Sequence, residues 1–183
     1  MAFVSFLVSK KSFEHLGFRR SPQWKSMAAQ VFGLMVVWSI ITLGVTIPVL
    51  HWLTGQNQDL SAFLNLKGNV PQLFGFLLAS WTLAALGEEF VYRGYMQQKV
   101  KELFGNTFLV GVISVVFSSV LFGLAHTEQG LIGVCITFLD AVWFSVIKRH
   151  YQNNLWAAVL AHGFSNSIGI IWFFFFGPIY SFW

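Results

Sequence analysis

Two adjacent glutamates, Glu88 and Glu89, stand at the end of a stretch that otherwise reads as a membrane-spanning helix, and Arg93 follows them. A charged side chain at the centre of a bilayer costs about 3 kcal/mol or more, so an acid there is a candidate functional residue. The four-residue spacing places Glu89 and Arg93 on one helix face, where they can form an ion pair. Glu88 has no such partner in the sequence, and an unpaired buried carboxylate can serve as a general base or acid.

Two histidines lie in later apolar stretches, within the segments Phe122-Gly-Leu-Ala-His126 and His162-Gly-Phe-Ser-Asn166. A single buried histidine is as readily explained by a hydrogen bond to a neighbouring helix. Two of them at similar depth, together with a carboxylate, favour catalysis. His162 and Asn166 share a helix face and can stabilise a developing oxyanion, although hydrogen bonding between helices explains the pair equally well. For Asp140, pairing with a histidine or arginine, orienting a ligand and plain hydrogen bonding stay open.

Carboxylate and neutral imidazole are also the ligands of catalytic zinc, which makes Glu88, His126 and His162 candidate metal ligands. The chain has no His-Glu-x-x-His pair, and these three residues come from separate segments. Their spacing therefore gives no support for a metal. Zinc is a candidate cofactor, and a mechanism without metal is equally open.

The composition is that of a membrane protein. The 183 residues are 56% hydrophobic and 10% charged, whereas about 25% charged residues is typical of soluble domains. A helix needs about 20 apolar residues to cross a bilayer. We expect an all-α polytopic bundle of about five transmembrane helices, enclosing a polar cavity. Its spans are expected at about 27–53, 71–104, 107–126, 130–148 and 155–177.

The basic residues divide unequally between the two sides of these spans. Ten of the eleven Lys and Arg residues fall on one side, and Lys67 alone falls on the other. This asymmetry predicts a cytoplasmic N-terminus. The net charge of +4 then reflects topology and contact with anionic lipids, and no nucleic-acid partner is expected. We expect residues 1–26 to form a cytoplasmic or interfacial segment and 27–183 to form the transmembrane domain, with a catalytic core at about 80–170. Met1–Ser9 is either an interfacial segment or the remnant of an upstream helix.

The polar residues are expected to meet near the middle of the membrane. At ~1.5 Å per helical residue, Glu88 precedes the Gly105 turn by about 26 Å and His126 follows it by about 32 Å. The two are then roughly level in a hairpin, and His162 reaches a similar depth. This requires a loop or broken helix at 127–133, which backbone lining a watery cavity tolerates. We expect access to the cavity from the cytoplasmic side.

The ordered motifs Glu-Glu-x-x-x-Arg, Phe-x-x-x-His and His-x-x-x-Asn resemble those of the CAAX-protease and bacteriocin-processing (CPBP/Abi) family. This family includes the type II CAAX prenyl endopeptidases and the bacterial bacteriocin self-immunity proteins. The resemblance covers residues 80–170. It implies an endopeptidase that is either glutamate- or metal-dependent and that cleaves a peptide bond within or near the membrane.

The resemblance also implies roles for individual residues. Glu88 would activate water with help from His126, while His162 and Asn166 would hold the carbonyl oxygen. The supporting residues Glu89 and Arg93 would shape the site.

The chain has fewer spans than the prenyl endopeptidases, so recognition of a prenylated substrate is open. We expect a multi-pass protein of a bacterial plasma membrane whose substrate is a peptide or membrane protein. It would act in peptide processing or bacteriocin self-immunity. The alternatives are a non-enzymatic immunity or membrane-protein-binding protein, and a proton-coupled carrier that uses Glu88, His126, Asp140 and His162 as a relay. The sequence leaves the oligomeric state open.

Overall fold

The structure of the protein is a computed structural model that describes residues 13–177. Over this range it is helical and contains no strand. Met1–Ser9, expected to be an interfacial segment or the remnant of an upstream helix, lies outside the described residues. The main helical segments are α2 (Trp24–Ile41), η2 (Thr42–Thr46), α3 (Ile47–Thr54), α4 (Val70–Ala79), η4 (Ser80–Glu88), η5 (Phe90–Met96), α5 (Gln97–Phe104), α6 (Phe108–Leu124), α7 (Gly130–His150) and α8 (Leu155–Phe176). Three short 3₁₀ turns complete the order, namely η1 (Phe13–Leu16), η3 (Ser61–Phe63) and η6 (Thr127–Gln129).

These segments join into five long rods. Four are long and apolar enough to cross a membrane, and they span Trp24–Thr54, Val70–Phe104, Thr127–His150 and Leu155–Phe176. The fifth rod, α6, has 17 residues and is about 25 Å long. The prediction of an all-α membrane helix bundle is therefore confirmed, and the expected spans agree with the rods to within a few residues.

Capping residues decide where the rods begin. The side chains of Asn69, Thr107 and Asn154 each accept a backbone N–H from the first turn of the following helix. Such caps satisfy N–H groups that have no partner within the helix. Gly105 ends α5 with φ at +94°, a conformation that glycine adopts without steric cost. The α5–α6 hairpin turn is thereby fixed two residues before the Thr107 cap.

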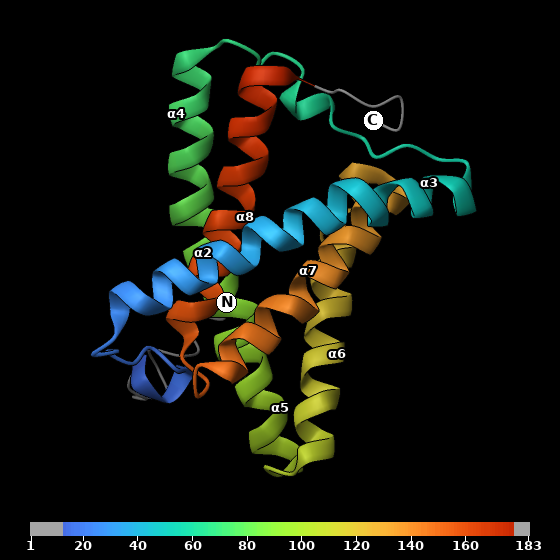
Figure 1. The fold of residues 1–183 in the computed structure, drawn as a ribbon. Helices are drawn as coiled ribbons and strands as arrows, with labels where there is room; N and C mark the ends of the chain where they lie inside the picture. Colours follow the sequence, from blue (N-terminus) through green and yellow to red (C-terminus); the bar gives the residue numbers. More distant parts are fainter. Residues whose placement is uncertain (1–12, 178–183) are drawn as a thin grey trace.

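The rods run in several directions, and α2 runs obliquely across the others (Figure 1). In this view α2 passes in front of α8, α4 runs beside the upper half of α8, and α5 runs beside α6. The α7 helix contacts both α6 and α8. Because α8 contacts α2, α4 and α7, a residue in its middle is positioned by all three.

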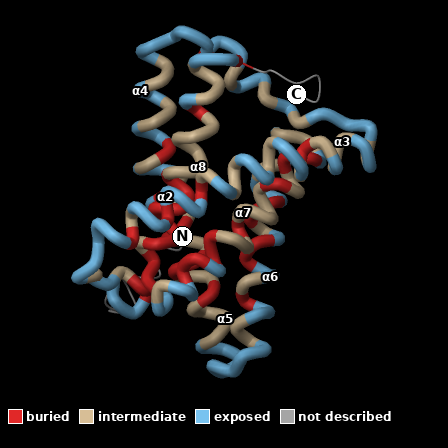
Figure 2. Tube along the Cα trace, viewed as in Figure 1, coloured by how far each residue is buried: buried red, intermediate tan, exposed pale blue. Residues whose placement is uncertain are grey.

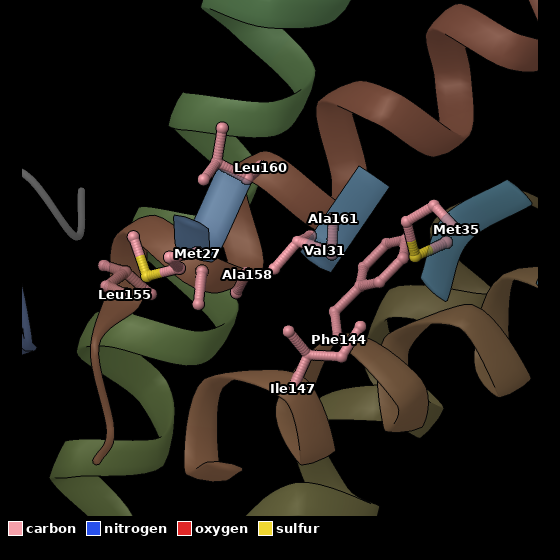
Figure 3. Close-up of a cluster of buried hydrophobic side chains, with 10 residues drawn as sticks. Met27, Val31, Met35, Phe144, Ile147, Leu155, Ala158, Leu160 and Ala161 are labelled. Carbon is pink, nitrogen blue, oxygen red and sulfur yellow. The ribbon is translucent and has the colours of Figure 1, made fainter. Parts of the chain in front are cut away.

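The buried residues concentrate where α2, α7 and α8 cross (Figure 2). Three side chains of α2, Met27, Val31 and Met35, belong there to one buried cluster with Phe144 of α7. Small residues of α8 let the helices approach closely. The close-up labels Ile147, Leu155, Ala158, Leu160 and Ala161 in the same cluster (Figure 3). Many large apolar side chains outside it are exposed, as expected of a surface that faces lipid; they include Leu78, Leu83, Phe108, Phe117 and Phe175.

The segment that carries both glutamates is wound differently from an ordinary α-helix. Two consecutive π-helical segments, η4 and η5, occupy almost all of residues 80–96. At the end of η5, the backbone N–H of Gln97 donates to the carbonyl of Tyr92, five residues back. π-Helical turns are rare and occur frequently at functional sites. The straight α-helix assumed in estimating the depth of Glu88 is therefore only an approximation.

The helix is interrupted after α6, as required for Glu88, His126 and His162 to lie at a similar depth. His126 follows the end of α6 and precedes η6, and Gly130 begins α7 with φ at +72°. Gly133, also expected within the break, lies inside α7. His126 therefore lies just after the end of α6, where the chain turns into η6 and then α7.

Candidate active site

Three interacting side chains, those of Arg93, Glu89 and His162, are buried inside the bundle. Oε1 of Glu89 lies 2.9 Å from Nη1 of Arg93 and 2.9 Å from Nδ1 of His162. The side chains of Glu89 and Arg93 are 0% exposed. The ion pair expected from the i, i+4 spacing is therefore present. Glu89 also holds the ring of His162, which the sequence did not indicate.

Aromatic rings surround the guanidinium of Arg93. Its Cζ lies 4.3 Å from the ring centroid of Phe122 and 5.6 Å from that of Phe144. Cation–π contacts of this kind contribute about 2 kcal/mol when desolvated. The buried Lys148 donates a hydrogen bond to the backbone carbonyl of Arg93. Two of the ten residues counted toward the charge asymmetry, Arg93 and Lys148, are thus inside the protein.

Glu88 lies in the opposite environment from its neighbour. Its side chain is 34% exposed, and its Oε2 is 3.9 Å from Nε2 of His162. That distance is too long for a direct hydrogen bond. Within residues 13–177, this Oε2 has no hydrogen-bond partner. Oε2 itself is buried toward His162, while the side chain as a whole lines the cavity and is reachable from it.

The imidazole of His162 is clamped from several sides. The ring of Phe144 stacks on it at 5.1 Å and 23°, and the ring of Phe122 meets it edge-on at 5.8 Å. With Nδ1–H donating to an ionised Glu89, the remaining ring nitrogen, Nε2, points toward Glu88. A histidine oriented by a carboxylate in this way has a fixed tautomer and a fixed ring plane.

Next to His162, a glycine allows close contact between α8 and η4. A Cβ built on Gly163 would lie 2.5 Å from the ring of Trp81. Only glycine therefore permits this contact. The indole N–H of Trp81 donates to Oγ of Ser167 at 3.1 Å. Trp81 thus fixes the segment that carries Glu88 against the helix that carries His162. A lone tryptophan in an apolar run gave no signal of this role in the sequence.

His126 is held by its own helix. Its Nδ1 lies 2.8 Å from the carbonyl oxygen of Phe122, four residues earlier. Because this carbonyl can only accept, Nδ1 carries the proton, and Nε2 is the acceptor in the neutral ring. The imidazole lies 4.7 Å from the ring of Phe122, so Phe122 separates His126 from Arg93. Both histidines therefore present Nε2 as their available nitrogen.

The predicted residues converge on one cavity of about 470 Å³. Glu88, His126, His162 and Asn166 all line it. We expected the cavity to open at the cytoplasmic, basic end, but its lining residues extend in another direction. Three come from the connection between α3 and α4, namely Gln58, Leu60 and Phe63. The cavity thus extends toward the end of the bundle that carries this connection.

Asp140 also lines the cavity, and a tryptophan holds it. Trp38 of α2 donates its indole N–H to Oδ1 of Asp140 at 2.6 Å. Trp38 itself stacks on Trp143 with ring centroids 5.2 Å apart. Of the alternatives left open for Asp140, the structure shows a hydrogen bond to a neighbouring helix. Asp140 also borders a second, smaller cavity of about 150 Å³ between α2 and α8.

The zinc candidates do not form a metal site in this arrangement. Over residues 13–177, no three His, Cys, Asp or Glu side chains lie close enough together to hold a metal ion. Glu88, His126 and His162 share a cavity, but they are not gathered around one point. The residues as placed do not fit a bound zinc ion.

The sequence was compared with protein families, curated proteins and solved structures. Residues 70–168 match the family described as type II CAAX prenyl endopeptidase Rce1-like. The match runs from α4 into α8 and spans more than half of the chain, including both glutamates, both histidines and Asn166. No curated protein and no solved structure matches the chain. The matched region contains most of the residues that line the cavity, and the chain belongs to the type II CAAX prenyl endopeptidase Rce1-like family of intramembrane proteases.

Proposed function

We propose that this protein hydrolyses a peptide bond at the membrane, with Glu88 as the general base. The observation that carries the proposal is the contrast between the two adjacent glutamates. Glu89 is fully buried and ion-paired with Arg93, while Glu88 is one-third exposed and lines the cavity. A general base must reach its proton directly or through one water molecule. Glu88 meets this requirement for a water molecule in the cavity.

In the proposed reaction, Glu88 removes a proton from a water molecule that His126 helps to position. The resulting hydroxide attacks the carbonyl carbon of the substrate and forms a tetrahedral oxyanion. When the C–N bond breaks, Glu88 returns its proton to the leaving amine. Microscopic steps of this kind contribute about 10²- to 10⁴-fold to the rate.

His162 and Asn166 are proposed to hold the oxyanion. Because Nδ1–H of His162 is directed at Glu89, the ring can donate from Nε2 only as an imidazolium. The carboxylate of Glu89 stabilises that charged form. Asn166 lies one turn further along the same helix face and lines the same cavity, where its amide N–H is a second donor. Glu89 and Arg93 are then positioning residues.

The substrate is proposed to be a peptide or membrane protein that enters with an apolar segment. Among the residues lining the cavity, Phe63, Phe76, Leu83 and Ile170 are apolar. Such a lining suits side chains of a membrane-embedded peptide. Processing of a small peptide or self-immunity to a bacteriocin, in a bacterial plasma membrane and with a cytoplasmic N-terminus, is the setting we propose.

Zinc bound by Glu88, His126 and His162 is the other form of this proposal. The residues would have to move closer together to hold it, so no step above uses a metal. Elemental analysis of the purified protein separates the two forms. Stoichiometric zinc that is lost in the Glu88→Gln, His126→Gln and His162→Gln variants would establish the metal form.

The decisive experiment compares one glutamate that lines the cavity, Glu88, with one that does not, Glu128. With purified protein in liposomes and a panel of fluorogenic peptides, we expect Glu88→Gln to lower cleavage by about 10²-fold or more. The control is Glu128→Gln, because Glu128 is exposed on η6 and lies outside the cavity lining. Wild-type cleavage by Glu88→Gln would refute the proposal, and a non-enzymatic binding role would then be favoured.

A further inference from the structure

A second polar hollow lies away from the active-site cavity, beside the α5–α6 turn. Its volume is about 290 Å³. We call it the basic pocket, because Arg19, Lys101 and Lys148 line it from three separate parts of the chain. The remaining lining residues are His15, Leu16, Gly17, Gln98, Glu102, Asn106 and Asn153. We propose that the basic pocket binds the phosphate of an anionic phospholipid headgroup.

The charges within the basic pocket do not balance. Its one acid is Glu102, which is already bound by His15 at 2.8 Å and by Lys99 at 3.1 Å. The buried ammonium of Lys148 donates to a backbone carbonyl and makes no ion pair with a carboxylate within residues 13–177. Like charges that share a hollow repel one another, and a bound anion would relieve that repulsion. The pocket therefore has an excess of positive charge that a phosphate can neutralise.

Hydrogen-bond donors in the basic pocket suit a phosphate. The guanidinium of Arg19 makes one long hydrogen bond, at 3.4 Å, to the carbonyl of Gln152. Since a guanidinium has five N–H donors, others are available to a ligand. The side-chain amides of Gln98 and Asn106 add neutral donors. Charge-assisted hydrogen bonds from Arg and Lys to phosphate are among the strongest in proteins.

The surroundings favour a phospholipid over a free phosphate. Asn106 lies in the turn between α5 and α6, and large apolar side chains flank it in sequence. Leu103, Phe104 and Phe108 are all exposed there, so a headgroup in the basic pocket has an apolar surface nearby for its acyl chains. Basic pockets between membrane helices are known sites for lipid headgroups.

A neighbouring hollow extends the positive surface. It has a volume of about 380 Å³, shares Arg19 with the basic pocket, and is also lined by Arg20 and His150. Trp24, one residue before Lys25, is exposed at this end of α2, which suits an aromatic side chain at headgroup depth. The whole end of the bundle is therefore suited to a membrane surface that carries negative charge.

The experiment measures thermal unfolding of the purified protein in phosphatidylcholine nanodiscs with and without phosphatidylglycerol. A lipid that binds only the folded state raises its stability. We expect phosphatidylglycerol to raise the unfolding temperature of the wild type and to have little effect on Arg19→Gln/Lys101→Gln. Native mass spectrometry should show about a tenfold loss of phosphatidylglycerol retention for each charge-assisted contact removed.

The matched control is Lys25→Gln/Lys67→Gln, which removes the same charge from exposed residues outside the basic pocket. It is expected to keep the response to phosphatidylglycerol, as is the charge-conserving variant Arg19→Lys/Lys101→Arg. An equal loss in both glutamine double variants would overturn the pocket as the binding site. Equal protection of the wild type by inorganic phosphate in phosphatidylcholine nanodiscs would overturn the assignment to a lipid.

Discussion

The cavity face and the sealed face of the π-helical segment carry the same side chain in opposite roles. On the sealed face, Glu89 is fully buried and bonded to both Arg93 and His162. On the cavity face, Glu88 is one-third exposed, and its Oε2 lies 3.9 Å from Nε2 of His162. Neighbouring residues therefore determine how far each of two adjacent acids is exposed and paired. In the proposed mechanism, Glu89, which has two close partners, positions His162, while Glu88, which has none as close, acts as the base.

Breaking the sealed face should have the largest effect on folding. In Glu89→Leu, the guanidinium of Arg93 becomes a buried charge without its carboxylate, which costs about 3–5 kcal/mol. We expect this variant to unfold at much lower temperature in detergent, whereas Glu88→Gln, on the cavity face, unfolds near the wild-type temperature.

A double variant tests the reason for that loss. Replacing both members of a buried ion pair with apolar residues is often neutral, so Glu89→Leu/Arg93→Leu should recover much of the stability. If Glu89→Leu unfolds at the wild-type temperature, the ion pair has no structural importance and the contrast between the two faces disappears.

The sequence predicted the spans and the converging residues because both depend on local patterns. Runs of apolar residues gave the helices, and the i, i+4 spacing gave the pair of Glu89 and Arg93. Glu88, His126 and His162 line one cavity, and the Gly105 turn and the helix break after His126 lie where glycine and polar residues indicated them. The family resemblance is confirmed by the match over residues 70–168.

Other features depend on contacts between distant residues and left no sequence signal. The apolar pattern of 80–96 is that of a spanning helix and did not indicate its π-helical winding. The hydrogen bonds from Trp38 to Asp140 and from Trp81 to Ser167 join residues 102 and 86 positions apart. The residues around Trp38 and Trp81 do not distinguish them from exposed tryptophans such as Trp52. The burial of Arg93 and Lys148 was likewise hidden, because a charge count treats every basic residue as exposed.

The two histidines differ in their contacts, because His162 is hydrogen-bonded to Glu89 and His126 is bonded to a carbonyl of its own helix. His162→Gln removes the imidazole that Glu89 holds, so we expect lower cleavage and a loss of about 1–3 kcal/mol from the unpaired carboxylate oxygen. His126→Gln breaks only a bond to the carbonyl of its own helix. It should lower cleavage by a similar factor while its unfolding temperature changes little. Parallel cleavage and unfolding assays check this, and equal destabilisation by both changes would contradict it.

The smallest effects are expected at Asp140, which borders the cavity but is bonded to an uncharged partner. In Asp140→Asn the side-chain oxygen can still accept the indole N–H of Trp38, so stability should change by less than about 1 kcal/mol and cleavage by only a few-fold. Asp140→Leu leaves that N–H without an acceptor and should cost about 1–3 kcal/mol. Unfolding temperatures of the two variants separate the hydrogen bond from the charge. A loss of cleavage in Asp140→Asn as large as that in Glu88→Gln would show that the negative charge at Asp140 takes part in the reaction, and the cavity face would then contain two reactive acids.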